Sequence, residues 1–287
     1  MDFGISTRCL RSRAVTIDLL ERLRRVESTR IELYANRPLF DFHDRPFLRS
    51  VARWFQENAL ASPSLHLPFE EDLGHGPKRP ISLTHPERRN RENAMDETKR
   101  CLELAERIPI DYAVLHLGGP GEHFEPAKFD LAYAAIAGIQ AFSGVRVFLE
   151  NIPNEIATLD RLLEFKTVAE LPDVGICYDT GHGHMDSVKF EMRIADLAGA
   201  MHVHDNDGAS DDHLWPFDGT IDWPGFIEAI VMSKFRGPFI LEPSGGLKKA
   251  HECRSRLRDL FHEAENSIEE FRLKYKLPSP QPNVGEP

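Results

Sequence analysis

The 287-residue chain contains few cysteines, and no two of the four form a CxxC pair: Cys9, Cys101, Cys177 and Cys253. Scattered cysteines of this kind indicate reduced thiols rather than a disulfide framework or a thiolate zinc site. Long hydrophobic runs are also missing, because even the Tyr133–Phe142 stretch is much shorter than the roughly 20 residues of a membrane-spanning helix. The N-terminus, MDFGISTRC, lacks the basic and apolar segments of a signal peptide. We therefore expect a cytoplasmic protein with no membrane partner.

Basic residues are in the minority, since 35 Lys and Arg face 46 Asp and Glu for a net charge of −11. This balance disfavours nonspecific binding to nucleic acid or to anionic lipid. The 41% of hydrophobic residues are ordinary for a globular protein, and the length allows a large core without disulfides. The last residues contain four prolines and little apolar content. The composition predicts a single domain over residues 1–275 and a flexible tail over residues 276–287.

Short strand-like runs alternate with amphipathic helical segments along the whole chain. The expected strands are Asp2–Thr7, Arg30–Tyr34, Ser64–Pro68, Tyr112–Leu117, Val145–Asn151, Val174–Asp179, Ala200–Asp205 and Pro238–Glu242. The expected helices are Val15–Ser28, Pro46–Leu60, Glu87–Ile108, Pro126–Phe142, Glu155–Leu171, Val188–Ala198, Trp223–Phe235 and Leu247–Leu273. Strict alternation requires parallel strands with right-handed crossovers. The α/β pattern of eight units predicts a (β/α)8 TIM barrel rather than an open Rossmann-type sheet, because no GxGxxG follows the first strand.

Ionisable residues stand at the ends of nearly all of these strands: Glu32, His66, His116, Glu150, Asp179, His204 and Glu242. In a barrel, the carboxyl ends of the strands surround one shared cavity, where such groups need a common partner. Histidine and carboxylate ligands without cysteine suit zinc, manganese, cobalt or magnesium.

Four of these residues are sufficient for one ion, namely Glu150, Asp179, His204 and Glu242. Five others are candidates for a second or third ion or for substrate contacts: His66, His116, His182, Asp211 and His213. Taken singly, each residue has a structural interpretation as well. Glu32 is the weakest of the candidates, and a pairing with an arginine is its alternative interpretation. His184 and His202 are candidates for hydrogen-bond partners that orient the ligands.

The segment after the eighth strand, Ser244, Gly245 and Gly246, precedes a helix and two lysines. Glycines at this position expose amide donors, and barrels often hold a phosphate there. An ordinary helix start explains the same residues, so both interpretations stay open.

Seven segments carry a resemblance to a known family: LHLPF, VLHLGG, FLENIP, ICYDTGHGHM, MHVHDNDG, DDHLWPFDGTIDW and FILEP. Over about residues 1–270 the chain resembles the xylose-isomerase-like TIM-barrel superfamily, which contains sugar and sugar-phosphate isomerases and epimerases and also endonuclease IV. In its ketose epimerases, the residues that match Glu150, Asp179, His204 and Glu242 hold one divalent ion. The two glutamates also move the proton, and the match to His182 contacts the substrate. These epimerases carry an arginine shortly after the seventh strand, whereas residues 204–213 contain none.

In endonuclease IV, nine ligands hold three zinc ions, and each has a counterpart in this chain: His66, His116, Glu150, Asp179, His182, His204, Asp211, His213 and Glu242. Two features depart from that branch. The DDHLWPFDGTIDW loop replaces a GEG-like turn, and no arginine-rich run with interleaved aromatics suggests a DNA-binding surface.

The first hypothesis is a metal-dependent sugar or sugar-phosphate isomerase or epimerase, in which Glu150 and Glu242 transfer a proton next to a carbonyl through an enediolate. The second is an endonuclease-IV-like multinuclear zinc phosphodiesterase of the AP endonuclease type. The third is a barrel that binds a sugar or a metal without turnover. We expect one to three divalent ions and a small-molecule substrate rather than nucleic acid. A homo-oligomer is compatible with the resemblance.

Overall fold

The computed structural model describes residues 2–10, 14–26, 30–58, 60–72, 78–171, 173–186 and 198–275. Within these ranges, eight parallel strands close into one barrel in the order β1-β10-β9-β8-β7-β6-β3-β2. The strands are β1 Phe3–Ser6, β2 Arg30–Tyr34, β3 Ser64–His66, β6 Tyr112–His116, β7 Arg146–Glu150, β8 Val174–Asp179, β9 Ala198–Val203 and β10 Phe239–Leu241. The prediction of a (β/α)8 TIM barrel is therefore confirmed.

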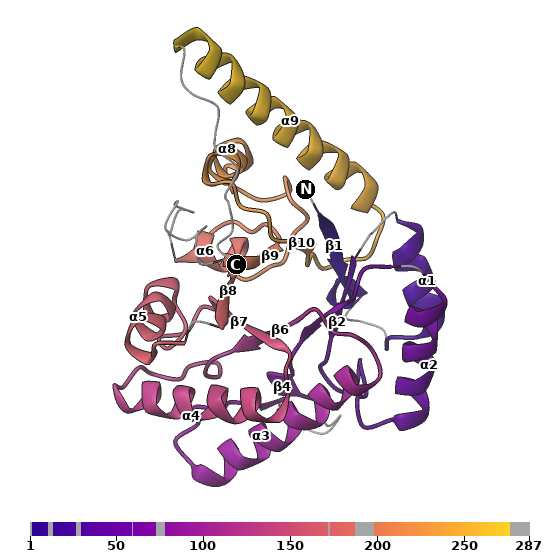
Figure 1. Ribbon diagram of the computed structural model, residues 1–287, viewed down its shortest axis with the longest axis vertical. Helices are drawn as coiled ribbons and strands as arrows, with labels where there is room; N and C mark the ends of the chain where they lie inside the picture. Colours follow the sequence, from indigo (N-terminus) through magenta and orange to yellow (C-terminus); the bar gives the residue numbers. More distant parts are fainter. Residues whose placement is uncertain are drawn as a thin grey trace.

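The helices lie around the outside of the strands (Figure 1). They are α1 Ile17–Arg25, α2 Arg45–Glu57, α3 Arg88–Leu102, α4 Ala127–Phe142, α5 Leu159–Ala169, α6 Thr180–Met185, α8 Trp223–Ser233 and α9 Ala250–Tyr275, with 3-10 turns η1 Thr7–Leu10 and η2 Glu103–Glu106. Side chains cap several of them, as Thr16 does for α1 and Asp44 for α2. The expected helix Val188–Ala198 lies outside the described residues except for Ala198, which begins β9, and the expected tail lies outside them too.

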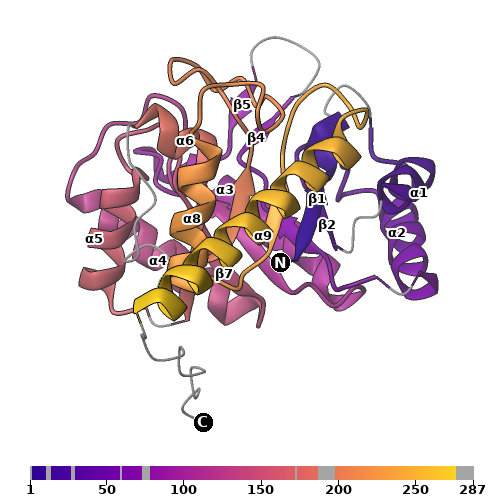
Figure 2. The same cartoon turned by 90° about the horizontal axis from the view of Figure 1, so that it is seen from above.

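Several elements differ from the sequence expectation. The short helix α6 was not expected, and the expected helix Glu87–Ile108 divides into α3 and η2. The helix expected from Glu155 begins only at Leu159, because the Asn154 side chain accepts hydrogen bonds from the amides of Ile156 and Ala157 and holds a turn there. After β3, a small antiparallel hairpin forms from β4 Glu70–Glu71 and β5 Arg79–Pro80. Figure 2 shows this hairpin and α6 at the same end of the barrel.

The barrel interior is filled below the polar end. Tyr112, Val114, Phe148, Cys177 and Ala200 form a buried cluster inside it. The Phe148 ring fits because Gly175 and Gly199 face it, where an added Cβ would lie only 2.4 and 2.3 Å from ring atoms. Side chains alternate along a strand, so Glu150 points to the same interior two residues further along. The cavity therefore opens only toward the carboxyl ends of the strands.

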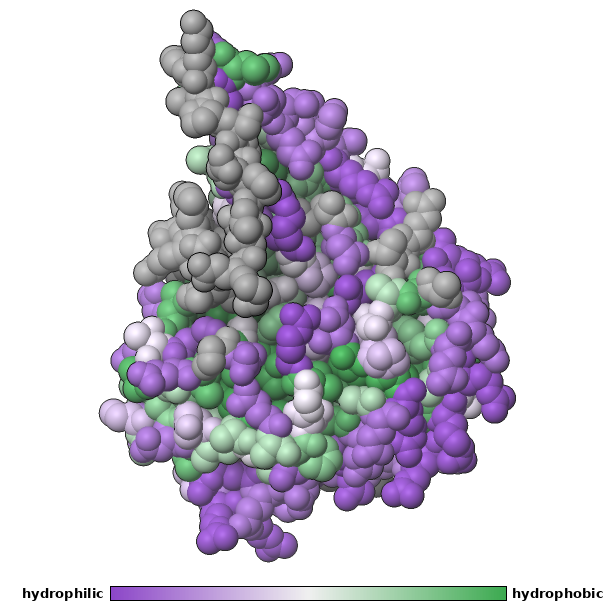
Figure 3. All heavy atoms as spheres, viewed as in Figure 1, coloured by the Kyte–Doolittle hydropathy of each residue, from purple (hydrophilic) through white to green (hydrophobic). Residues whose placement is uncertain are grey.

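A larger hydrophobic core lies between the barrel and the helices, with fully buried side chains that include Leu20, Ile31, Phe165, Trp223 and Phe239. On the face seen in Figure 3, hydrophobic residues show in the middle of the molecule and hydrophilic residues cover its rim. No helix in the described part of the chain is both long enough and apolar enough to cross a membrane.

Candidate active site

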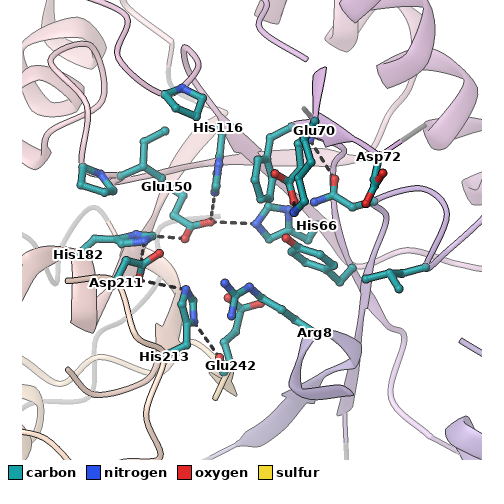
Figure 4. Close-up of a pocket in the computed structure, with 18 of the residues that line it drawn as sticks. Arg8, His66, Glu70, Asp72, His116, Glu150, His182, Asp211, His213 and Glu242 are labelled. Carbon is teal, nitrogen blue, oxygen red and sulfur yellow. Dashed lines mark hydrogen bonds and ion pairs between the residues drawn. The ribbon is translucent and has the colours of Figure 1, made fainter. Parts of the chain in front are cut away.

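A cavity of about 600 Å³ lies at the carboxyl ends of the strands. Seven of the residues selected from the sequence line it: His66, His116, Glu150, His182, Asp211, His213 and Glu242 (Figure 4). The other two, Asp179 and His204, are fully buried and lie behind this lining. The barrel thus brings together ionisable groups from segments that are almost 180 residues apart in the chain.

Glu150 lies among four histidines, one of which is His202, whose Nδ1 lies 3.2 Å from Oε2. Its Oε2 atom is 3.0 Å from His116 Nε2 and 3.3 Å from His66 Nε2. Its Oε1 atom is 3.6 Å from Nδ1 of His182. The β6–β7 register pairs His116 directly with Glu150, which explains the contact between these two residues.

Asp179 occupies the end of β8 and begins α6. Its Oδ1 atom accepts a hydrogen bond from the His182 amide at 2.8 Å and lies 2.9 Å from Nε2 of His204. Gly181 makes room for the His204 ring, because a Cβ at this position would lie 2.0 Å from Cε1. The glycine of the DTGH segment is therefore required by the position of a site histidine.

Asp211 joins the histidines on the opposite side of the cavity. Its Oδ1 atom lies 3.1 Å from Nε2 of His213 and 3.5 Å from Nε2 of His182. The rings of His204 and His213 stack with centroids 3.6 Å apart.

Three of the histidines are held by backbone carbonyls. Nδ1 donates from His66 to Leu67, from His182 to Asn151 and from His213 to Glu242, at 2.8 to 2.9 Å. A carbonyl oxygen can only accept, so Nδ1 carries a hydrogen in each of these rings and Nε2 is the nitrogen that faces the neighbouring carboxylates. This orientation of histidine is common at metal sites.

Several buried polar atoms have no hydrogen-bond partner among the described residues, among them Asp179 Oδ2, Glu242 Oε1 and His204 Nδ1. His202 Nδ1 and His204 Nε2 lie 3.2 and 2.9 Å from carboxylate oxygens but without hydrogen-bond geometry. Buried polar atoms are seldom left unsatisfied, and divalent cations satisfy this kind of donor set. Ligand atoms within 4.8 Å of one another form three groups: Glu150, Asp179, His202 and Glu242; His182, His204, Asp211 and His213; and His66, Glu150 and His202. The residues present therefore fit one or more metal ions.

The grouping differs from the sequence expectation in one respect. His202 joins Glu150, Asp179 and Glu242, whereas His204 joins the second group while still contacting Asp179. His202 was expected to orient ligands, and it is placed to do so as well, since its Nε2 lies 3.1 Å from Glu32 Oε2. Glu32 is fully buried and also accepts a hydrogen bond from Ser64, so its partners are His202 and Ser64 rather than the arginine considered as an alternative.

The two glutamates experience different electrostatic environments. Burial raises the pKa of Glu242 to about 8. Burial also acts to raise the pKa of Glu150, but the charges of His202 and His116 outweigh it and hold that pKa well below its usual range. Burial together with the charge of His204 lowers the pKa of His213 to about 3, which keeps this ring neutral. Glu242 therefore retains its proton to a higher pH than Glu150 does.

The loop after β9 is organised by Asp205, which the sequence analysis did not select. Its carboxylate accepts hydrogen bonds from the amides of Phe217 and Ile221 and from the Trp223 indole, at 2.8 to 3.2 Å. Asp205 thus connects the end of β9 to residues 218–223 and their neighbour Phe217. These contacts also fix both ends of the loop that carries Asp211 and His213.

Arg8, in the turn after β1, also lines the cavity and was not among the expected site residues. It directly follows the expected first strand, Asp2–Thr7, so an ionisable residue at a strand end is the signal that identifies it.

In the segment expected to bind phosphate, two of the three backbone amides already donate hydrogen bonds within the protein. The Ser244 amide donates to the His213 carbonyl and the Gly246 amide to the Cys9 carbonyl, at 2.6 and 3.0 Å. Gly245 and Gly246 adopt φ values of 100° and 91°, which favour glycine. Phosphate binding by Ser244, Gly245 and Gly246 remains a prediction.

A closed barrel with histidines and carboxylates gathered at its carboxyl-end mouth is the arrangement of a TIM-barrel enzyme site. The model of the family described as xylose isomerase-like TIM barrel matches residues 20–260. The chain belongs to this family, and the resemblance noted in the sequence is confirmed.

Relatives and solved structures agree with this assignment. The uncharacterized protein y4fM of Sinorhizobium fredii is 35% identical over an alignment of 198 residues. The match covers 61% of this chain and 64% of that protein, less than two thirds of its length. The crystal structure of a D-tagatose 3-epimerase-like protein has a TM-score of 0.76 at 17% identity and covers 93% of this chain and 100% of that one. An L-ribulose 3-epimerase has a TM-score of 0.74 at 15% identity, with coverage of 94% and 97%. Both structures show the same fold.

Proposed function

We propose that this chain is a divalent-metal-dependent isomerase or epimerase that acts on a sugar or sugar phosphate. The observation that carries the proposal is the meeting of Glu150 and Glu242 in one cavity, within one group of potential metal ligands, from strands on different sides of the ring. The names of the structural neighbours, both connected with sugar 3-epimerases, support the same reaction class.

Glu150, Asp179, His204 and Glu242, with His202 close to them, would hold the ion. A bound divalent cation would polarise the substrate carbonyl and stabilise negative charge on its oxygen. One of the two carboxylates, Glu150 or Glu242, would take the proton beside the carbonyl, and the other would return a proton to the planar enediolate. His182 and Asp211 line the same cavity and would contact substrate hydroxyls.

The test is exchange of substrate hydrogen in heavy water. The native protein, incubated with divalent metal and a panel of ketoses, aldoses and their phosphates, should incorporate deuterium at the carbon next to the carbonyl. Glu150→Gln and Glu242→Gln should each lower the rate by at least about 100-fold, which is the usual contribution of a general acid or base. Glu70→Gln is the matched control, since Glu70 lines the same cavity but belongs to none of the three ligand groups. Exchange that survives both glutamate substitutions would remove them from the chemistry.

A second candidate is an endonuclease-IV-like phosphodiesterase. The specific observation in its favour is that all nine residues of that branch converge, with His66 and His116 both on Glu150. Two or three bound ions per chain and cleavage of abasic-site DNA without deuterium exchange would support it, whereas one ion with exchange supports the isomerase.

The four cysteines are buried free thiols, and we propose a cytoplasmic location on that basis.

A further inference from the structure

We propose that Arg8 forms an anion-binding subsite, so that the substrate of this cavity carries a phosphate or carboxylate group. The inference rests on the proposed function, because it specifies the class of sugar that the same site accepts.

Arg8 lies in η1, immediately beyond β1, and is only 8% exposed. Its backbone amide donates to the Ser6 side chain at 3.3 Å, which fixes the start of this turn. The guanidinium lines the cavity, with Cζ 5.7 Å from the centroid of the Tyr34 ring. Figure 4 shows the side chain pointing toward the middle of the pocket, beside Glu242. The charged end of Arg8 is thus presented to the substrate side of the cavity.

The guanidinium is incompletely paired. Nη1 is buried without a hydrogen-bond partner among the described residues, and Arg8 forms no ion pair with any carboxylate in that part of the chain. The other cations that line the cavity differ: Arg37 contacts Glu71 and Glu97 at 3.0 and 3.4 Å, and Lys78 pairs with Glu70. A buried cation without an ionic partner is costly, and the planar guanidinium fork matches phosphate and carboxylate oxygens.

The charges around Arg8 lead to the same conclusion. The carboxylates whose fields reach it are those of Glu242 and Asp211. Both belong to groups of potential metal ligands, so an ion bound there would use their negative charge. Arg8 would then face the substrate as an uncompensated cation. A neutral sugar offers it only hydroxyl groups, whereas a phosphate or carboxylate supplies the missing charge and two acceptor oxygens.

The loop after β10 supports the turn that carries Arg8. The Gly246 amide donates to the Cys9 carbonyl at 3.0 Å, which fastens residues 244–246 to this turn. None of these three residues lines the cavity, so the loop holds Arg8 in place and Arg8 itself is the group that faces the anion.

The experiment compares anionic and neutral ligands by calorimetry on the metal-loaded native protein. The matched probes are D-fructose against D-fructose 6-phosphate, and D-glucose against D-gluconate. We expect one anionic member to bind at least tenfold more tightly than its neutral partner, and the pair that shows it assigns the anion as phosphate or carboxylate. Equal or tighter binding of both neutral sugars overturns the proposal without any variant.

Variants assign the preference to Arg8. In Arg8→Gln, the ratio of affinities for the anionic and the neutral ligand should fall at least tenfold. Arg8→Lys should retain part of this ratio because the positive charge remains. Arg37→Gln, which removes another arginine of the same cavity, should retain all of it. A preference that persists in Arg8→Gln, or inorganic phosphate that binds equally to Arg8→Gln and the native protein, places the anion on the metal ions alone and refutes the subsite.

The two proposals fail separately. Deuterium exchange in neutral sugars with no anion preference would leave the isomerase standing and eliminate the Arg8 subsite. An Arg8-dependent anion preference with no exchange in any sugar of the panel would eliminate the isomerase and leave Arg8 as an anion-binding residue.

Discussion

Gly181 shows how a residue without a side chain determines the position of one with catalytic potential. It follows Asp179 by two residues, and its α-carbon faces the ring of His204 across the β8–β9 junction. An alanine at this position would place Cβ within 2.0 to 2.7 Å of three atoms of the imidazole, closer than van der Waals contact allows. The ring would have to leave its position between Asp179 and His213.

We expect Gly181→Ala to weaken metal binding by at least about tenfold, the lower range for substitutions that disturb the orientation of ligands. Metal titration followed by calorimetry measures the effect. Gly144→Ala is the matched control, because a Cβ there has no neighbour within 4 Å and should leave metal binding unchanged. Equal affinity in native protein and Gly181→Ala would show that His204 takes no part in holding the ion.

At the scale of elements, the segment between β9 and α8 is held together by hydrogen bonds to one carboxylate, that of Asp205. Asp205 is fully buried and accepts from donors at positions 206, 217, 221 and 223, so it closes the loop on itself. Asp211 and His213 lie between these anchors. The loop contributes two groups to the site and has no regular structure of its own apart from an isolated bridge between Asp205 and Leu214.

Asp205→Asn should therefore loosen the loop and lower the free energy of unfolding by about 1–3 kcal/mol, because a charged acceptor is replaced by an amide that must turn a donor toward other donors. Hydrogen exchange should show faster exchange of the Phe217 and Ile221 amides. Asp222→Asn is the control: Asp222 caps α8 through the Gly225 amide, and asparagine caps a helix equally well. The prediction is wrong if exchange at 217 and 221 is the same in Asp205→Asn and the control.

At the scale of the whole molecule, the site gathers buried acidic groups that a cation would stabilise only in the folded state. Glu32, Glu150, Asp179 and Glu242 are fully buried or nearly so, and the interior that contains them is closed by the Phe148 cluster below. Binding of an ion to the native state alone raises the free energy of unfolding by mass action.

A divalent ion at about 100 times its dissociation constant should stabilise the fold by about 2.7 kcal/mol, or roughly 4–8 °C in Tm for a chain of this size. Thermal unfolding with Zn²⁺ or Mn²⁺, and again after chelation, measures this shift. Glu150→Gln should lose most of it, since Glu150 belongs to two of the three ligand groups. A Tm that is independent of metal and chelator contradicts a metal centre of any nuclearity.

The sequence by itself determined the architecture, because alternation of strand and helix patterns is a local property and eight such units close a parallel barrel. It also determined which residues reach the mouth, since strand ends are visible in the hydrophobic pattern. The start of α5 was misjudged because the turn at Asn154 depends on hydrogen bonds from its side chain rather than on hydrophobic periodicity.

Only the tertiary structure decided which of the residues at the carboxyl end of the barrel group together as potential ligands of one ion. His202 and His204 are two residues apart, and this spacing does not tell which of them contacts Glu150 and Glu242. In the structure His202 makes these contacts, because its ring is oriented by the contact with Glu32. The same holds for Arg8, whose position next to Glu242 arises from the pairing of the first strand with the last. Closure of the ring joins the two ends of the chain, and such contacts depend on the shape of the folded molecule rather than on local patterns of residues.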